Sequence, residues 1–139
     1  MKKYLFAIIV AGIIPSSCKE EKRADTSQMK KVMAIHDEVM PKMSTIGSLV
    51  GKLSELENDS TAMGKEYEEA RIELQDAHKS MMDWMKGFGD RFDSDEILNG
   101  KELTEQKQKW LDEEELKVIA LKTQINESIE KARELMDHD

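Results

Sequence analysis

The stretch ENDSTAMGK, residues 57–65, decides the fold because it interrupts a long helical pattern. Asn58 and Asp59 are turn-forming residues, and the hydroxyl of Ser60 or Thr61 can cap a helix that follows them. A short connection between two helices folds the chain back on itself, so its two neighbours are expected to lie antiparallel. The stretch therefore predicts a helical hairpin with its turn near residue 59.

Apolar residues recur at steps of three and four on both sides of this turn. That spacing places them on one face of a helix. Before the turn, the pattern predicts one helix of roughly 30 residues. Pro41 is expected to kink it, because proline cannot donate a backbone hydrogen bond to the carbonyl of Asp37. After the turn, a second helix is expected to stop at Gly87 and Gly89.

A polar connection, GDRFDSDEILNGKE, follows at residues 89–102, with one turn of helix expected at SDEIL. From about Lys101 a third apolar stripe continues without Gly or Pro. No segment shows the two-residue alternation of a half-buried strand. We therefore expect an all-α fold over residues 28–139: an antiparallel three-helix bundle (up-down-up) with coiled-coil character. If the third helix extends past the hairpin, its apolar surface would suit a protein partner or a homodimer.

The composition agrees with long solvated helices. Of the 139 residues, 36% are charged and only 5% are aromatic, which is typical of helical rods rather than of a sheet or a large core. The formal net charge is −8. So acidic a chain repels phosphate backbones, and we expect no nucleic-acid partner.

The N-terminal stretch MKKYLFAIIVAGIIPSSC, residues 1–18, combines two lysines, an apolar run, small residues and the single cysteine of the chain, Cys18. The apolar run is about 11 residues long, whereas a spanning helix needs about 20, so residues 1–17 predict a secretion signal peptide. The stretch resembles a bacterial lipobox, with Pro15 where leucine is usual. We expect a lipid such as palmitate on Cys18 and a flexible tether over residues 18–27. The alternative is a signal cleaved elsewhere, with an incidental thiol.

Three charged residues follow the cysteine directly. Lys19, Glu20 and Glu21 resemble the export signal of surface lipoproteins in Bacteroidetes, although a charged tether would look the same. Together with Cys18 they predict an outer-membrane lipoprotein, held to the membrane by its N-terminal lipid. The protein would face either the periplasm or the cell surface.

Two segments share a pattern of histidine and methionine: MAIHDEVMPKM, residues 33–43, and AHKSMMDWM, residues 77–85. In each segment a histidine is followed by methionines four and seven positions later, so the three side chains share one helix face. A hairpin that turns near residue 59 would bring the two sets into one layer, with His36 opposite Met82. The six candidate residues are His36, Met40, Met43, His78, Met82 and Met85.

Two interpretations of this layer compete. Thioether and imidazole ligands suit copper(I), a soft ion, which would be the one cofactor of the protein. Alternatively, the methionines fill irregular gaps in the core beside Pro41, and the histidines are only hydrogen-bonded. Trp84 has two comparable interpretations: packing on the third helix, or an exposed aromatic anchor for a partner.

The acidic runs carry simpler interpretations. DSDE, residues 93–96, lacks the ligand spacing of a calcium loop, so we expect a solvated loop or a helix cap. DEEE, residues 112–115, predicts a solvated helix face that pairs with Lys109 and Lys117. The chain contains no Gly-rich phosphate loop, nucleophile elbow or HExxH arrangement. We therefore expect no catalytic residue and no enzymatic activity.

The segments MAIHDEVMPKM and AHKSMMDWMKGF resemble a family of small Bacteroidetes lipoproteins whose members are often labelled "viral A-type inclusion protein". The similarity spans most of the chain after Cys18. It implies a lipoprotein with a helical fold. The family has no established activity, so the resemblance implies no catalytic residue.

Overall fold

The computed structural model describes residues 21–137, and within this part of the chain every regular element is a helix and none is a strand. The prediction of an all-α fold is confirmed. The elements are α1 (Glu21–Val39), α2 (Lys42–Leu56), α3 (Ala62–Arg91), α4 (Ser94–Leu98) and α5 (Glu105–Asp137). The predicted signal peptide, Cys18, Lys19 and Glu20 lie outside the described residues. Helix α1 includes residues 21–27, which the sequence analysis assigned to the tether.

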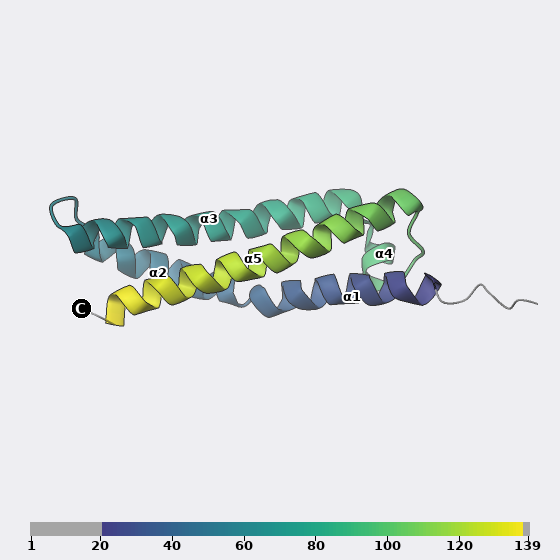
Figure 1. Cartoon of the computed structure of the whole chain (residues 1–139), viewed down its shortest axis with the longest axis horizontal. Coiled ribbons are helices and arrows are strands. Elements are labelled where there is room, and N and C mark those ends of the chain that lie inside the picture. The colour runs from purple at the N-terminus through teal and green to yellow at the C-terminus, as the bar shows by residue number, and fades with distance from the viewer. Residues whose placement is uncertain (1–20, 138–139) are drawn as a thin grey trace, which may run out of the picture.

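Pro41 has a larger effect than the predicted kink, because the expected single helix is divided into α1 and α2. Met40 and Pro41 form a turn between them. The amide of Met40 still donates to the carbonyl of His36 at 2.9 Å, and the amide of Met43 donates to the carbonyl of Met40 at 3.1 Å. These two bonds keep the turn between the helices short. Helix α2 continues along the long axis that α1 begins (Figure 1).

The predicted hairpin turn joins α2 to α3 and is held by hydrogen bonds among four residues. The Thr61 hydroxyl caps α3 by accepting a hydrogen bond from the amide of Gly64 at 2.9 Å. The Asn58 side chain accepts from the amide of Ser60 at 2.8 Å, and the Asn58 amide donates to the Gly64 carbonyl at 3.3 Å. The turn near Asn58 and the cap at Thr61 are confirmed.

Helix α3 does not stop at its two glycines, so that prediction was wrong. The helix continues to Arg91, and Phe88 and Phe92 at its end are both buried. A glycine inside a helix costs about 0.5–1 kcal/mol relative to alanine, whereas burying one phenylalanine stabilises by about 1.5–3 kcal/mol. Burial of the aromatic rings therefore outweighs the glycines.

The expected single turn of helix is α4, and its start shows what the acidic run DSDE does. The carboxylate of Asp93 accepts hydrogen bonds from the amides of Asp95 and Glu96, and the Glu96 carboxylate accepts from the amide of Asp93. This reciprocal arrangement is a capping box. The helix-cap interpretation is confirmed.

Helix α5 runs parallel to α1 and α2. Six hydrogen-bonded pairs join them, and in four of these the two partners are 84 residues apart in the chain: Gln28–Asp112, Lys31–Glu115, Glu38–Lys122 and Lys42–Asn126. The other two, Gln28–Gln108 and Gln28–Glu115, differ from this separation by about one helical turn. A constant separation along two helices means that they run in the same direction, and it persists across the break at Pro41.

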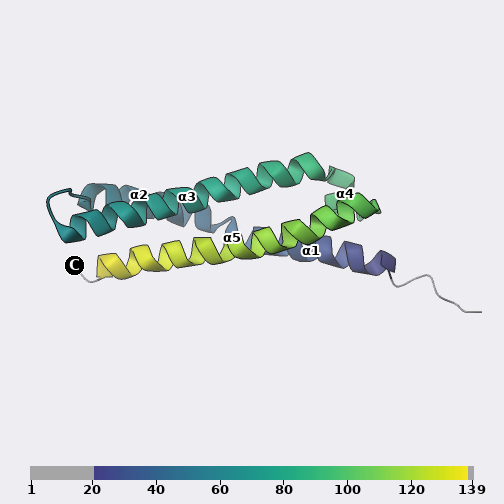
Figure 2. The same ribbon diagram turned by 45° about the horizontal axis from the view of Figure 1, so that its top comes forward.

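Helix α3 runs antiparallel to α5. Lys131 pairs with Glu73 at 2.6 Å, and Arg91 pairs with Glu113 at 2.8 Å. The two residue numbers of each pair have the same sum, which is the pattern expected when two helices run in opposite directions. Helix α5 ends at the end of the bundle where α2 turns into α3 (Figures 1 and 2). It therefore does not extend past the hairpin as the sequence suggested.

The core lies between these rods, and each rod contributes fully buried side chains. Val32 of α1, Leu74 of α3 and Val118 of α5 are all inaccessible to water. Where α1 begins, α1 and α3 are further apart, and α4 lies between them (Figure 1). The wider space is filled by large side chains, which form the candidate site described below.

We predict that Gly64→Ala destabilises the protein. A Cβ at residue 64 would lie 2.3 Å from the backbone oxygen and 2.6 Å from the backbone nitrogen of Asn58. Backbone atoms cannot move aside cheaply, so the turn must open. We expect the free energy of unfolding to fall by about 1–3 kcal/mol, measured by urea denaturation followed by circular dichroism.

Gly51→Ala is the matched control, because a Cβ at residue 51 of α2 meets nothing within 4 Å. It should stabilise the helix by about 0.5–1 kcal/mol. Equal effects of the two substitutions would contradict the close approach of Asn58 and Gly64.

We also predict that the contacts between α1 and α5 weaken in acid. Hydrogen bonds from Lys31 and Gln28 hold the pKa of Glu115 below its ordinary value of 4.5, and a hydrogen bond from Lys122 lowers the pKa of Glu38. A lowered pKa in the folded state stabilises the protein above pH 4.5, and this contribution disappears as the pH falls through the folded-state pKa.

The measurement is urea denaturation between about pH 6 and about pH 3. The variant Glu38→Gln/Glu115→Gln should lose less stability over this range than the parent chain. Glu130→Gln/Glu134→Gln removes the same number of carboxylates, both from exposed positions of α5, and serves as the control. An identical loss in all three chains would contradict a stabilising role for these contacts.

Candidate functional site

The predicted histidine–methionine layer draws its residues from the first rod (α1 and α2) and from α3. His36 of α1 has its ring centroid 5.9 Å from that of Trp84 of α3. The hairpin therefore brings His36 close to the position where the sequence placed it, opposite Met82. The His36 Nδ1 atom also lies 2.9 Å from a carboxylate oxygen of its neighbour Asp37.

The six candidate residues differ in their surroundings. The four methionines, Met40, Met43, Met82 and Met85, are half-buried and pack against the hydrophobic core. His36 is also half-buried, but His78 is exposed. The methionines thus pack against the core, which agrees with one of the two interpretations. Among the described residues, no three His, Cys, Asp or Glu side chains gather into a metal-binding group. Copper(I) binding by the methionine thioethers remains a prediction.

A column of rings extends from His36 toward the α4 end of the bundle. Trp84 stacks on Phe88 with centroids 5.0 Å apart, and Phe88 contacts Phe92 at 4.8 Å. Trp84 is only 9% exposed, so the interpretation of this residue as an exposed anchor was wrong. Its indole nitrogen is buried without a hydrogen-bond partner among the described residues. The column contacts α1 through His36, in the last turn of that helix.

Two glutamates are buried next to this column, and both are paired. Glu114 is 2% exposed and accepts hydrogen bonds from Arg91 at 2.9 Å and Lys117 at 2.8 Å. Glu96 accepts from Lys107 at 2.6 Å. Buried carboxylates require such partners, because an unpaired charge in the interior is strongly destabilising. These pairs hold the ends of α3, α4 and α5 together.

The predicted solvated face at residues 112–115 was wrong for two of its members. Glu114 is buried, and Glu115 bonds to Lys31 and Gln28 of α1. A signal was present in the sequence, since Glu114 follows Leu111 by three positions and precedes Val118 by four. That spacing places it on the buried stripe of the helix.

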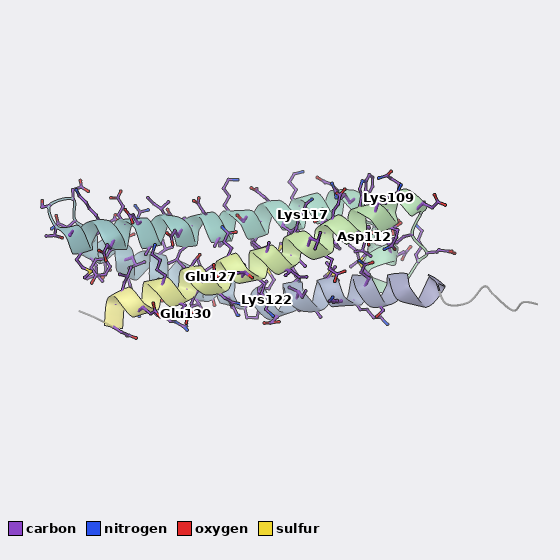
Figure 3. All side chains as sticks on the ribbon, viewed as in Figure 1. Lys109, Asp112, Lys117, Lys122, Glu127 and Glu130 are labelled. Carbon is purple, nitrogen blue, oxygen red and sulfur yellow. The ribbon has the colours of Figure 1, made fainter. Side chains whose placement is uncertain are left out.

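The outward side of α5 carries a second candidate site that the sequence analysis missed. Leu116 is 72% exposed and Ile119 is 42% exposed, and both lie in the middle of the helix. Figure 3 shows charged residues along the same side. We call this surface the α5 face and define it by residues Lys109, Asp112, Leu116, Ile119, Ala120, Thr123 and Glu127, which are all exposed. The signal in the sequence was two large apolar residues outside the buried stripe.

A shallow groove of about 490 Å³ lies between α3 and α5, beside the α5 face. Trp84, Gly87 and Lys117 are among the residues that line it. The one buried carboxylate in its wall, Glu114, already has two partners. The groove therefore presents little unpaired polar chemistry to a small ligand.

No helix within residues 21–137 combines the length and the apolar character needed to cross a bilayer. Comparison of the chain with protein-family models, with curated proteins and with solved structures finds no match.

Proposed function

We propose that this chain is a lipid-anchored protein of the cell envelope that acts as a non-enzymatic binding or scaffold module. The observation that carries the proposal is the exposure of Leu116 and Ile119 on the α5 face. Each apolar side chain gains about 25 cal/mol for every Å² that a partner removes from water. The bundle already has its own filled core, so this gain is available only through contact with another molecule.

The proposed scaffold is an up-down-up three-helix bundle with coiled-coil character, in which α1 and α2 together act as the first rod. The constant separation of 84 residues between that rod and α5 supports it. This separation is a whole number of heptads, so equivalent positions of two parallel helices meet along their length.

The proposed anchor is a lipid on Cys18, in the outer membrane, with the bundle on the periplasmic face or at the cell surface. Lys19, Glu20 and Glu21 would serve as the export signal. Helix α1 begins at one end of the bundle, whereas the α5 face runs along its side (Figures 1 and 3). An anchor before α1 would thus leave the α5 face accessible to a partner.

The test uses the full chain in its host, with a photo-crosslinking amino acid at residue 116. We expect the chain in the membrane fraction and a crosslinked adduct from residue 116. Residue 75 of α3 is exposed and lies away from the α5 face, so a probe there should yield no adduct. Cys18→Ser should move the chain to the soluble fraction.

Two results would count against this proposal. One is that probes at positions 116, 119 and 123 give no adduct, just as the probe at position 75 gives none. The other is unchanged membrane association of the Cys18→Ser variant, which would remove the anchor.

The second candidate function is binding or sequestration of copper(I) by the histidine–methionine layer. It is supported by the incomplete burial of Met40, Met43, Met82 and Met85, which leaves soft ligands within reach of an ion. An anaerobic copper(I) titration against a chromogenic chelator distinguishes it from the first proposal. Copper binding requires competition at stoichiometric protein, and replacing all four methionines by leucine should abolish it.

Met63→Leu is the matched control, because Met63 is 40% exposed at the start of α3 and lies outside the layer. It should leave the titration unchanged. If the parent chain does not compete with the chelator, the copper proposal fails and the methionines only pack the core.

A further inference from the structure

We propose that the α5 face binds the α5 face of a second copy of this chain. The two α5 helices would be antiparallel, and the two-fold axis between them would cross the α5 face at the level of residue 118. The inference rests on the proposed binding function and names its partner. In such a contact the same surface serves both copies, so each residue pairing occurs twice.

The centre of this contact is apolar. Leu116 and Ala120 are four residues apart on the exposed side of α5, and both are equally far from residue 118. The two-fold axis therefore places Leu116 over Ala120 of the second copy. The small alanine side chain leaves room for the leucine and lets the two helices approach closely. Ile119 borders the same patch and is also exposed.

The charges on either side of this centre are complementary under the same axis. Lys109 precedes Leu116 by seven residues, and Glu127 follows Ala120 by seven residues. The axis that pairs Leu116 with Ala120 consequently pairs Lys109 with Glu127 of the second copy. Within its own chain, neither charge forms an ion pair with another described side chain. Both labelled side chains lie on the outward side of α5 (Figure 3).

This arrangement favours a second copy over an unrelated partner. A surface with one sign of charge would indicate an oppositely charged molecule, whereas the α5 face carries both signs. Lys109 and Asp112 precede its apolar centre and Glu127 follows it, and Asp112 is already bonded to Gln28 and Gln108 of its own chain. Each copy carries a net charge of −8, but the resulting general repulsion is screened beyond about 8 Å at physiological ionic strength. The close contacts between Lys109 and Glu127 then decide the orientation.

The size of the face sets the expected affinity. The helix between Lys109 and Glu127 is about 27 Å long, so the contact is at the small end of specific protein interfaces. We expect a reversible dimer with a Kd in the micromolar range, on the order of 10–100 µM.

The test is sedimentation velocity over a range of concentrations, with the full chain carrying Cys18→Ser so that no lipid is attached. Leu116→Asp should weaken the association by about 30-fold. Ile72→Asp is the matched control, because Ile72 is an exposed apolar residue of α3 outside the α5 face. It should leave the association unchanged. Circular dichroism should show the same helical content in each variant, since both positions are exposed.

Charge reversal tests the antiparallel orientation. Lys109→Glu alone and Glu127→Lys alone each place two like-charged pairs in the dimer, and each should weaken association about tenfold. The double variant Lys109→Glu/Glu127→Lys should restore it. An equimolar mixture of the two single variants should also associate, because both charge pairs are again opposite in the mixed dimer.

Three outcomes would overturn the proposed dimer: a chain that stays monomeric at every concentration, a dimer that Leu116→Asp leaves intact, or charge reversals without mutual rescue. Crosslinking from residue 116 in cells then separates the two proposals. If the adduct differs in mass from two copies of the chain, the proposed binding function stands and its partner is another protein. If no adduct forms either, both proposals fail.

Discussion

The close approach of Asn58 and Gly64 is the constraint on which the rest of the structure depends. A Cβ at residue 64 would overlap the backbone of Asn58, so the turn closes only around a residue without a side chain. Once closed, it sets the register of α2 against α3 along their whole length. The contact between His36 and Trp84, far from the turn in the chain, is a consequence of that register.

The end of the bundle away from the turn is packed differently. Helices α1 and α3 are separated where α1 begins (Figure 1), and a column of rings from His36, Trp84, Phe88 and Phe92 extends toward that end. The four half-buried methionines of the two segments pack against the core. A flexible thioether side chain adapts to irregular space better than a branched one, which explains why methionine is frequent in these two segments whether or not a metal binds there.

The polar residues of α5 divide its surface into three sides with different roles. One side pairs with α1 and α2 at a constant separation, and another pairs with α3 through Glu113, Glu114 and Lys131. The third side faces away from the bundle and contains Leu116 and Ile119, whose exposure contributes nothing to the stability of one chain. The proposed binding function and the proposed dimer rest on this third side, and the dimer would give these residues a partner.

The sequence by itself determined that the chain is helical and where it turns back and is capped, because the periodicity of apolar residues and the turn and cap chemistry of Asn58, Thr61 and Asp93 act over a few residues. It also placed His36 near its observed partner, since a short turn restricts the register of a hairpin. Only the tertiary structure decided the rest. Gly87 and Gly89 remain helical because Phe88 and Phe92 are buried by other elements, and Glu114 is buried because Arg91 of α3 lies close enough to pair with it. The exposure of Leu116 depends in the same way on how three rods pack, and no local pattern in one helix contains that information.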